Sequence, residues 1–218
     1  MEAKFIAIEG IDGAGTTTQS ARLRDALAAR GQRCLLTCEP SRGPVGTLIR
    51  LGLSGRLALC PAGGSSAIAM APAKAGEDEE ALYALLFAAD RMDHLLNEIN
   101  PALQAGSYVV TDRYYLSSFA YQSTRCDLAW LRQLNLHCRK PHVTFLLDAD
   151  PAVCLQRIGN DRHGRDRYEK LEQLQVIRDN YLKIAEILRG EGERIVQLDG
   201  TGPAETIHEA ILKEIMGG

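Results

Sequence analysis

The chain has 218 residues, of which 45% are hydrophobic and 24% are charged, and its formal net charge is −3. This length suits one domain with a substantial core, and the composition excludes an intrinsically disordered chain. A weakly acidic chain has no broad basic surface, so we expect no nucleic acid partner. The six cysteines contain no Cys-x-x-Cys pair, and the first apolar run, residues 5–8, is too short for a signal core or a membrane span. We therefore expect a cytoplasmic protein with reduced thiols and no membrane association.

Apolar, strand-like runs alternate with amphipathic, helix-like segments along the chain. The expected strands cover residues 5–9, 34–38, 108–111, 143–147 and 195–198. The expected helices cover residues 17–30, 78–96, 171–188 and 204–216, and the apolar side of the second one contains Leu82, Leu85, Leu86 and Ala89. Such alternation is typical of a parallel sheet with helices on both faces. We therefore expect a three-layer α/β/α fold with five parallel strands, in a single domain over residues 1–218.

Two segments do not fit this alternation. Residues 61–76 are rich in Ala, Gly, Ser and Pro, carry one charge at Lys74, and are typical of a flexible surface insertion. Residues 157–168 gather four arginines, interrupted by Gly159 and Gly164. This second segment fits either a mobile lid that closes over phosphates or a solvated surface loop, and its composition does not decide between them.

The first expected strand leads into a glycine-rich loop, which is the strongest functional signal. The loop comprises Gly10, Ile11, Asp12, Gly13, Ala14, Gly15, Thr16, Thr17 and Thr18. Its spacing fits the phosphate-binding pattern of Gly, four free positions, Gly, Lys and Ser or Thr, except that Thr16 replaces the lysine. Backbone N–H groups of such a loop bind phosphate at the start of a helix, and the Thr17 hydroxyl is placed to ligate Mg²⁺. The loop predicts a nucleotide-dependent phosphoryl-transfer protein that lacks one expected positive charge.

Asp112 and Arg113 directly follow the third expected strand. In open α/β sheets ligands bind at the carboxyl ends of the strands, so both side chains are expected beside the phosphate-binding loop. A carboxylate there can hold a metal ion, and an arginine can bind a phosphate with two parallel hydrogen bonds. The pair is therefore a candidate metal and phosphate site.

Phe87 and Arg91 lie four residues apart in the helix expected at residues 78–96, and hence on one helical face. A ring that stacks and a guanidinium that donates hydrogen bonds would suit a nucleobase. A core phenylalanine beside a solvated arginine explains the same spacing equally well.

In this order, the motifs resemble the thymidylate kinase family of P-loop nucleoside monophosphate kinases. The resemblance is carried by residues 5–19, Glu39-Pro40, residues 86–91, Asp112-Arg113-Tyr114 with Ser117, Ala120, Tyr121 and Gln122, and residues 141–148. It implies a P-loop NTPase-type fold with a mobile lid at about 157–168. It also implies a homodimer that, with Mg²⁺, transfers the γ-phosphate of ATP to dTMP and yields dTDP and ADP.

The resemblance implies a role for each matching residue. On the ATP side it assigns phosphate contacts to the loop 10–18 and to the lid arginines Arg162, Arg165 and Arg167, and Mg²⁺ to Thr17 and Asp112. On the dTMP side Asp12 contacts the 3′-hydroxyl, Phe87 stacks on thymine, Arg91 hydrogen-bonds the base, Arg113 holds the 5′-phosphate and Tyr121 crowds the 2′ position. The further dTMP contacts are assigned to Glu39, Arg50, Ser117 and Gln122.

Three departures from the family pattern leave the activity open. Thr16 replaces the loop lysine, Cys38 replaces an arginine that grips the dTMP phosphate, and the insertion 61–76 is longer than usual. Lid arginines are the candidate replacements for the lysine, and Arg42 or Arg50 for the arginine. An active dTMP kinase is the favoured interpretation. The alternatives are a weak or inactive nucleotide-binding regulatory module and a kinase for another deoxynucleoside monophosphate.

Overall fold

The computed structural model describes residues 3–57, 77–159 and 164–217. The side chains of residues 77–78 and 164–169 are not described. The expected insertion at residues 61–76 lies outside the described residues.

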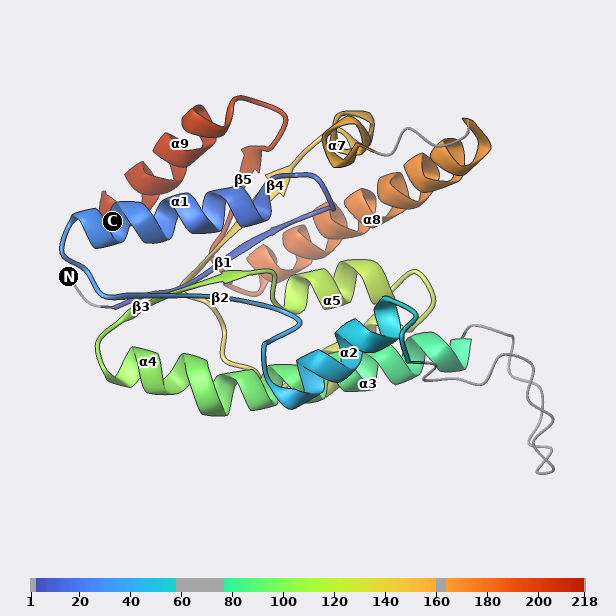
Figure 1. Ribbon diagram of the computed structural model, residues 1–218, viewed down its shortest axis with the longest axis horizontal. Coiled ribbons are helices and arrows are strands. Elements are labelled where there is room, and N and C mark those ends of the chain that lie inside the picture. The colour runs from blue at the N-terminus through green and yellow to red at the C-terminus, as the bar shows by residue number, and fades with distance from the viewer. Residues whose placement is uncertain (1–2, 58–76, 160–163, 218) are drawn as a thin grey trace.

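Five parallel strands form the central sheet (Figure 1). In chain order they are β1 (Phe5–Gly10), β2 (Cys34–Cys38), β3 (Tyr108–Asp112), β4 (Val143–Asp148) and β5 (Ile195–Asp199). Their order across the sheet is β2-β3-β1-β4-β5, and each neighbouring pair is parallel. Helices α1 (Thr16–Ala29) and α9 (Ala204–Met216) cover one face, and α3 (Glu77–His94) and α4 (Asn100–Gln104) lie on the other. The expected α/β fold with a five-stranded parallel sheet is confirmed, and each expected strand ends within one residue of the observed one.

The central position of β1 follows from its sequence. All six of its residues are buried, as expected for a strand covered by helices on both faces. In the register with β3 and β4, Ile8 lies opposite Asp112 and Gly10 lies opposite Leu147. The carboxyl ends of these three strands therefore meet at one edge of the sheet, which brings the glycine-rich loop next to Asp112.

The remaining helical segments have ten residues or fewer, except for one, which has 27. They are α2 (Pro44–Leu53), the π-helical turn η1 (Leu95–Ile99), α5 (Tyr115–Gln122), α6 (Leu128–Leu134), α7 (Pro151–Ile158) and α8 (Gly164–Gly190). Of these, α7 has clear local signals: the Asp150 side chain accepts hydrogen bonds from the N–H groups of Ala152 and Val153, Pro151 starts the helix, and Gly159 ends it at φ 72°. No helix in the described ranges combines the length and apolar character needed to cross a membrane.

Helix α8 begins seven residues earlier than the expected start at residue 171. The segment expected as a lid, residues 157–168, is accordingly helical at both ends, since residues 157–158 finish α7 and residues 164–168 open α8. Residues 160–163 lie outside the described residues. Arg162 is therefore not placed, and Arg165 and Arg167 are placed only by the backbone of α8.

The apolar side expected for α3 is wrong at two of its four residues, while the other two, Leu82 and Leu86, are half-buried. Leu85 is 48% exposed and Ala89 is also exposed, whereas Ala84, Ala88 and Arg91 are buried. These three residues follow a spacing of four and then three, so they share one face of the helix. An arginine on the buried face is possible only if its charge and N–H groups find partners there, and the site provides them.

Candidate active site

The glycine-rich loop joins β1 to α1 in the conformation that its glycines allow. Gly13 has a φ of +84°, and a Cβ atom at this position would lie 2.6 Å from the carbonyl oxygen of Cys154. No other residue could occupy that position without moving the loop or α7. No described side chain caps the start of α1, so its first N–H groups face the loop without an intrahelical partner. This arrangement suits a bound anion.

Thr16 is the first residue of α1 and is buried. The loop itself therefore contributes no side-chain cation at the position where the phosphate-binding pattern has lysine.

Thr17 and Asp112 meet where β1 and β3 end. The Thr17 hydroxyl donates a hydrogen bond to Asp112 Oδ2 at 2.5 Å, while Asp112 Oδ1 is buried and has no hydrogen-bond partner among the described residues. A hydroxyl and an unpartnered carboxylate oxygen fit Mg²⁺, which prefers oxygen ligands. The described residues contain no group of three His, Cys, Asp or Glu side chains suited to a metal. A magnesium ion here would take its other ligands from water and phosphate, as is usual for this ion.

Arg113 follows Asp112 and connects the loop to α5. Its Nη2 atom lies 2.7 Å from Asp12 Oδ1, and its guanidinium carbon lies 5.3 Å from the centre of the Tyr121 ring. Tyr121 also contacts the loop, because its hydroxyl accepts a hydrogen bond from the Asp12 N–H at 3.1 Å. Arg113 has a φ of 70°, the only positive value of a non-glycine residue in the described chain. Such strained residues concentrate at functional sites.

Glu9 lies behind Arg113 and was not singled out by the sequence patterns. It is fully buried, and Ser117 and Tyr181 hydroxyls connect it to the arginine. Burial raises the pKa of Glu9 from 4.5 to about 7, against the opposing effects of the Ser117 hydroxyl and Arg113. The sequence signal that could have identified Glu9 was its residue type, since an ionisable side chain in an otherwise apolar strand needs a buried partner.

Arg91 lies at the centre of a buried polar cluster on the other side of α5. Its Nε donates to Glu39 Oε2 at 2.9 Å, its Nη2 donates to Ser118 Oγ at 2.7 Å, and its Nη1 donates to Asn135 Oδ1. Arg91 is completely buried and Phe87 is half-buried. This is the reverse of a core phenylalanine beside a solvated arginine, so that alternative is wrong.

The structure brings some of the other candidate residues to this region and adds two. Gln122 is buried in α5, next to the aromatic residue Tyr121. Arg50 is exposed and donates to the carbonyl oxygen of Pro40 at 2.9 Å, at the end of the Glu39-Pro40 motif. Ser118 and Asn135 were missed, because a serine and an asparagine in unassigned segments have no pattern that marks them as partners of an arginine.

Arg157 holds the loop rather than pointing into it. From α7 it donates to the carbonyl oxygens of Gly200 and Thr201, both at 2.8 Å, and to that of Gly13 at 3.4 Å. Its guanidinium thus joins the glycine-rich loop to the turn after β5.

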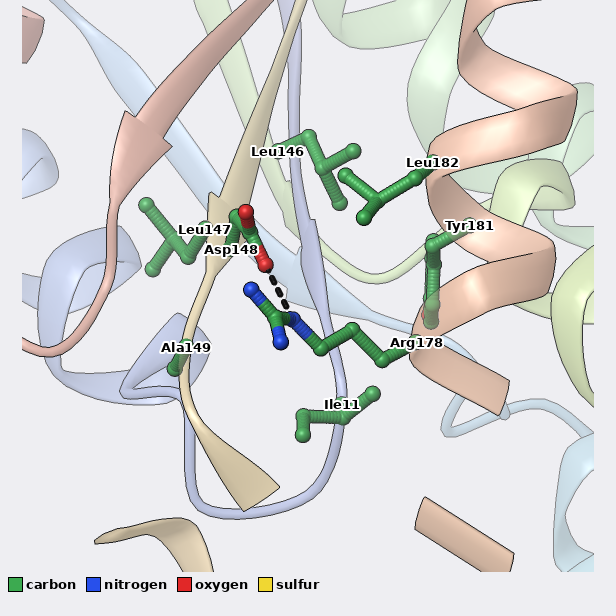
Figure 2. Close-up of a pocket in the computed structure, with 8 residues that line it drawn as sticks. All are labelled: Ile11, Leu146, Leu147, Asp148, Ala149, Arg178, Tyr181 and Leu182. Carbon is green, nitrogen blue, oxygen red and sulfur yellow. Dashed lines mark hydrogen bonds and ion pairs between the residues drawn. The ribbon is translucent and has the colours of Figure 1, made fainter. Parts of the chain in front are cut away.

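Among the cavities that border the loop, two differ greatly in size. The larger, about 620 Å³, is lined by Asp12 and Gly13, by Tyr121 and by the facing sides of α7 and α8, where Lys170 is the only lysine or arginine among the described residues that line it. The smaller, about 10 Å³, is at the lower limit for one water molecule. Figure 2 shows Arg178 reaching across it from α8 to Asp148, at 2.5 Å, beside Ile11 of the loop. Of these two cavities, the larger has room for a nucleotide group and the smaller does not.

The chain is similar to known proteins over most of its length. Residues 8–59 and 63–211 match the family model described as thymidylate kinase. The chain is 40% identical over 210 residues to a probable thymidylate kinase from Thermococcus kodakarensis, covering 95% of both proteins. It is 35% identical over 209 residues to one from Pyrobaculum calidifontis, covering 95% of this chain and 93% of the relative. It is 31% identical over 223 residues to one from Methanosarcina acetivorans, covering 99% and 97%. The chain belongs to the thymidylate kinase family.

Proposed function

We propose that the protein is a dTMP kinase, which transfers the γ-phosphate of ATP to dTMP and releases dTDP and ADP. The observation that carries the proposal is the ion pair of 2.7 Å between Asp12 and Arg113. It joins the loop that suits the phosphates of one nucleotide to an arginine that suits the phosphate of another. Phosphoryl transfer needs mainly alignment and neutralisation of charge, and a site where two phosphate-binding elements touch supports both.

On the donor side, the N–H groups of loop 10–18 would bind the ATP phosphates. Thr17 and Asp112 would hold Mg²⁺, which neutralises charge on the phosphate oxygens when it is bound. The buried, unpartnered Oδ1 of Asp112 supports this assignment.

On the acceptor side, Arg113 would bind the 5′-phosphate of dTMP and Asp12 the 3′-hydroxyl. Phe87 would stack on thymine, and Arg91 would donate a hydrogen bond to the edge of the base from a guanidinium oriented by Glu39. Tyr121 would exclude a 2′-hydroxyl. The remaining contacts would come from Arg50, Ser117 and Gln122.

The charge that Thr16 does not supply would come from the side of the lid. Arg162, Arg165 and Arg167 are the candidates from sequence, and Lys170 is the candidate that the described cavity adds. Lys170 is exposed, and no described residue forms an ion pair or hydrogen bond with it. The other described cations at the loop already have partners: Arg113 pairs with Asp12, Arg178 pairs with Asp148, and Arg157 bonds carbonyl oxygens.

We also infer a single domain with a closing lid, a homodimer and a cytoplasmic location; the lid and the homodimer follow from the family resemblance. Leu85 and Leu96, on α3 and η1, are 48% and 65% exposed. Eleven residues are about three helical turns, so the two exposed leucines lie on one side of this helix and support a subunit contact along it. Light scattering on the purified protein tests the dimer.

The test of the proposed activity is an assay of the purified protein with Mg·ATP and a panel of nucleoside monophosphates, with a chelator control. We expect dTDP and ADP from dTMP, and no product after the metal has been removed. Binding of ATP and dTMP by calorimetry without formation of dTDP would favour the regulatory module. Faster turnover of another deoxynucleoside monophosphate would identify that nucleotide as the phosphate acceptor in place of dTMP, while the proposed phosphoryl transfer from ATP would still hold.

A further inference from the structure

Glu9 is a buried carboxylate that accepts four hydrogen bonds from described residues. Its Oε1 accepts hydrogen bonds from the N–H groups of Tyr114 at 2.9 Å and Ser117 at 3.3 Å. Its Oε2 accepts from the Ser117 hydroxyl at 2.5 Å and from the Tyr181 hydroxyl at 3.4 Å. These donors come from α8 and from the segment that opens α5, so the carboxylate joins three elements behind the phosphate-binding loop.

The two hydroxyls that bond to Glu9 also contact Arg113. Arg113 Nη1 donates to Ser117 Oγ at 3.4 Å and to Tyr181 Oη at 3.5 Å, and the two hydroxyl oxygens lie 2.6 Å apart. Glu9 is therefore one hydroxyl away from the guanidinium, while Asp12 binds that guanidinium from the loop.

This geometry sets the direction of the hydroxyl groups. A carboxylate only accepts hydrogen bonds. Each of the two hydroxyl protons, of Ser117 and Tyr181, therefore points either directly at Glu9 or at the other hydroxyl, which in turn donates to Glu9. Their lone pairs then face the N–H groups of Arg113. A neutral amide in place of the carboxylate would donate to one hydroxyl, whose proton would then turn toward the positively charged arginine.

We propose that Glu9 is a positioning residue for Arg113, and that through Ser117 and Tyr181 it orients the guanidinium toward the 5′-phosphate of the acceptor nucleotide. The proposal rests on the proposed function, since it concerns the binding of dTMP. The simpler possibility is that Glu9 only attaches β1 to α5. The two differ in ligand specificity, because a purely structural residue would not distinguish a ligand with a phosphate from one without.

The experiment compares binding of dTMP and of thymidine, which lacks the phosphate, to wild type and Glu9→Gln by calorimetry at pH 8. We expect Glu9→Gln to weaken dTMP binding at least tenfold and thymidine binding less than twofold, with an unchanged Kd for ADP. In steady-state assays the KM for dTMP rises and the KM for ATP does not. In an Arg113→Ala background, Glu9→Gln should cause no further loss of dTMP affinity, because its partner is gone.

Glu193→Gln is the matched control. Glu193 is also a largely buried carboxylate, and it accepts a hydrogen bond from the Tyr115 hydroxyl at 2.5 Å. No hydrogen bond between described residues connects it to Arg113. The Glu193→Gln substitution should therefore leave the affinity for dTMP unchanged. If Glu9→Gln does not fold, Tyr181→Phe removes one of the two hydroxyls and is expected to weaken dTMP binding but not thymidine binding.

The outcomes separate the two proposals. Equal loss of dTMP and thymidine affinity, or no loss of either, in a folded Glu9 variant overturns the positioning role and leaves the kinase function intact. Wild-type protein that binds neither dTMP nor thymidine overturns the proposed function, and the positioning role with it.

Discussion

Asp12 and Arg113 are 101 residues apart in the chain and form an ion pair of 2.7 Å. Asp12 belongs to the glycine-rich loop, and Arg113 follows the neighbouring strand β3, so the pair joins the two halves of the candidate site. The Arg113 side chain is 21% exposed and that of Asp12 is 59% exposed, which leaves both accessible to a ligand. The value of the pair thus lies in the placement of two functional groups more than in stability, because exposed ion pairs contribute little.

Replacing Arg113 tests this placement directly. Arg113→Ala removes a charged donor, and hydrogen bonds to charged groups are worth about 1.5–3 kcal/mol, so kcat/KM for dTMP should fall roughly 10- to 150-fold. Arg113→Lys should recover only part of this loss, since an ammonium group cannot form two parallel bonds. The measurement is initial velocity against dTMP concentration. Arg132→Ala, which removes an exposed ion pair with Glu191, is the control, and an equal loss in that variant would rule out a specific role.

Breaking the buried pair of Arg91 and Glu39 should cost stability. Their side chains are 1% and 2% exposed and their atoms lie 2.7 Å apart. Glu39→Ala leaves the arginine buried without its counter-charge, which typically destabilises a protein by about 3–5 kcal/mol. Urea unfolding measures the change. Glu205→Ala, which removes the exposed partner of Arg22, should cost less than about 1 kcal/mol. A similar small cost for Glu39→Ala would show that another group neutralises Arg91.

The fold was largely predictable because its strands are mainly apolar runs, four of which end at glycine or aspartate and one of which, β2, ends at Cys38. The unpredicted helices α2, α4, α5, α6 and α7 are short, and α5 buries residues around most of its circumference. Such a segment has no polar side to produce a helical pattern. The start of α8 was placed too late because its first turns are rich in charged residues and carry little apolar periodicity.

The candidate site was predictable where function requires a local motif, as in the loop and in Asp112-Arg113. Its supporting residues were not, because their partners are distant in the chain. Asn135 lies 44 positions from Arg91, and Tyr181 lies 68 positions from Arg113. No spacing rule connects such pairs. Their proximity follows from the order of the strands and from the packing of α8 against α5.

Glu9 should make stability depend on pH. Its pKa is raised by burial from 4.5 to about 7 in the folded protein. Between these values the folded state holds a proton that the unfolded state has released, so the free energy of unfolding should fall as pH rises. The shift corresponds to a loss of about 3 kcal/mol across this range. Urea unfolding at pH 5 and pH 8 measures it, and Glu9→Gln should reduce the difference between the two values. An unchanged pH dependence in Glu9→Gln would assign the effect to other groups.

Lys170 offers the sharpest test of how the protein works without the loop lysine. It is the one cation lining the larger cavity in the described part of the chain, and Gly13 of the loop also lines this cavity. If it supplies the missing charge, Lys170→Ala should lower kcat roughly 10- to 150-fold, the range expected for one charged hydrogen bond, with little change in the KM for dTMP. Thr16→Lys, which restores the usual residue, should then rescue Lys170→Ala. Lys183→Ala removes another exposed lysine of the same helix and is the matched control. Wild-type rates in Lys170→Ala would exclude Lys170, and a loss in Arg165→Ala or Arg167→Ala would then assign the charge to the lid arginines.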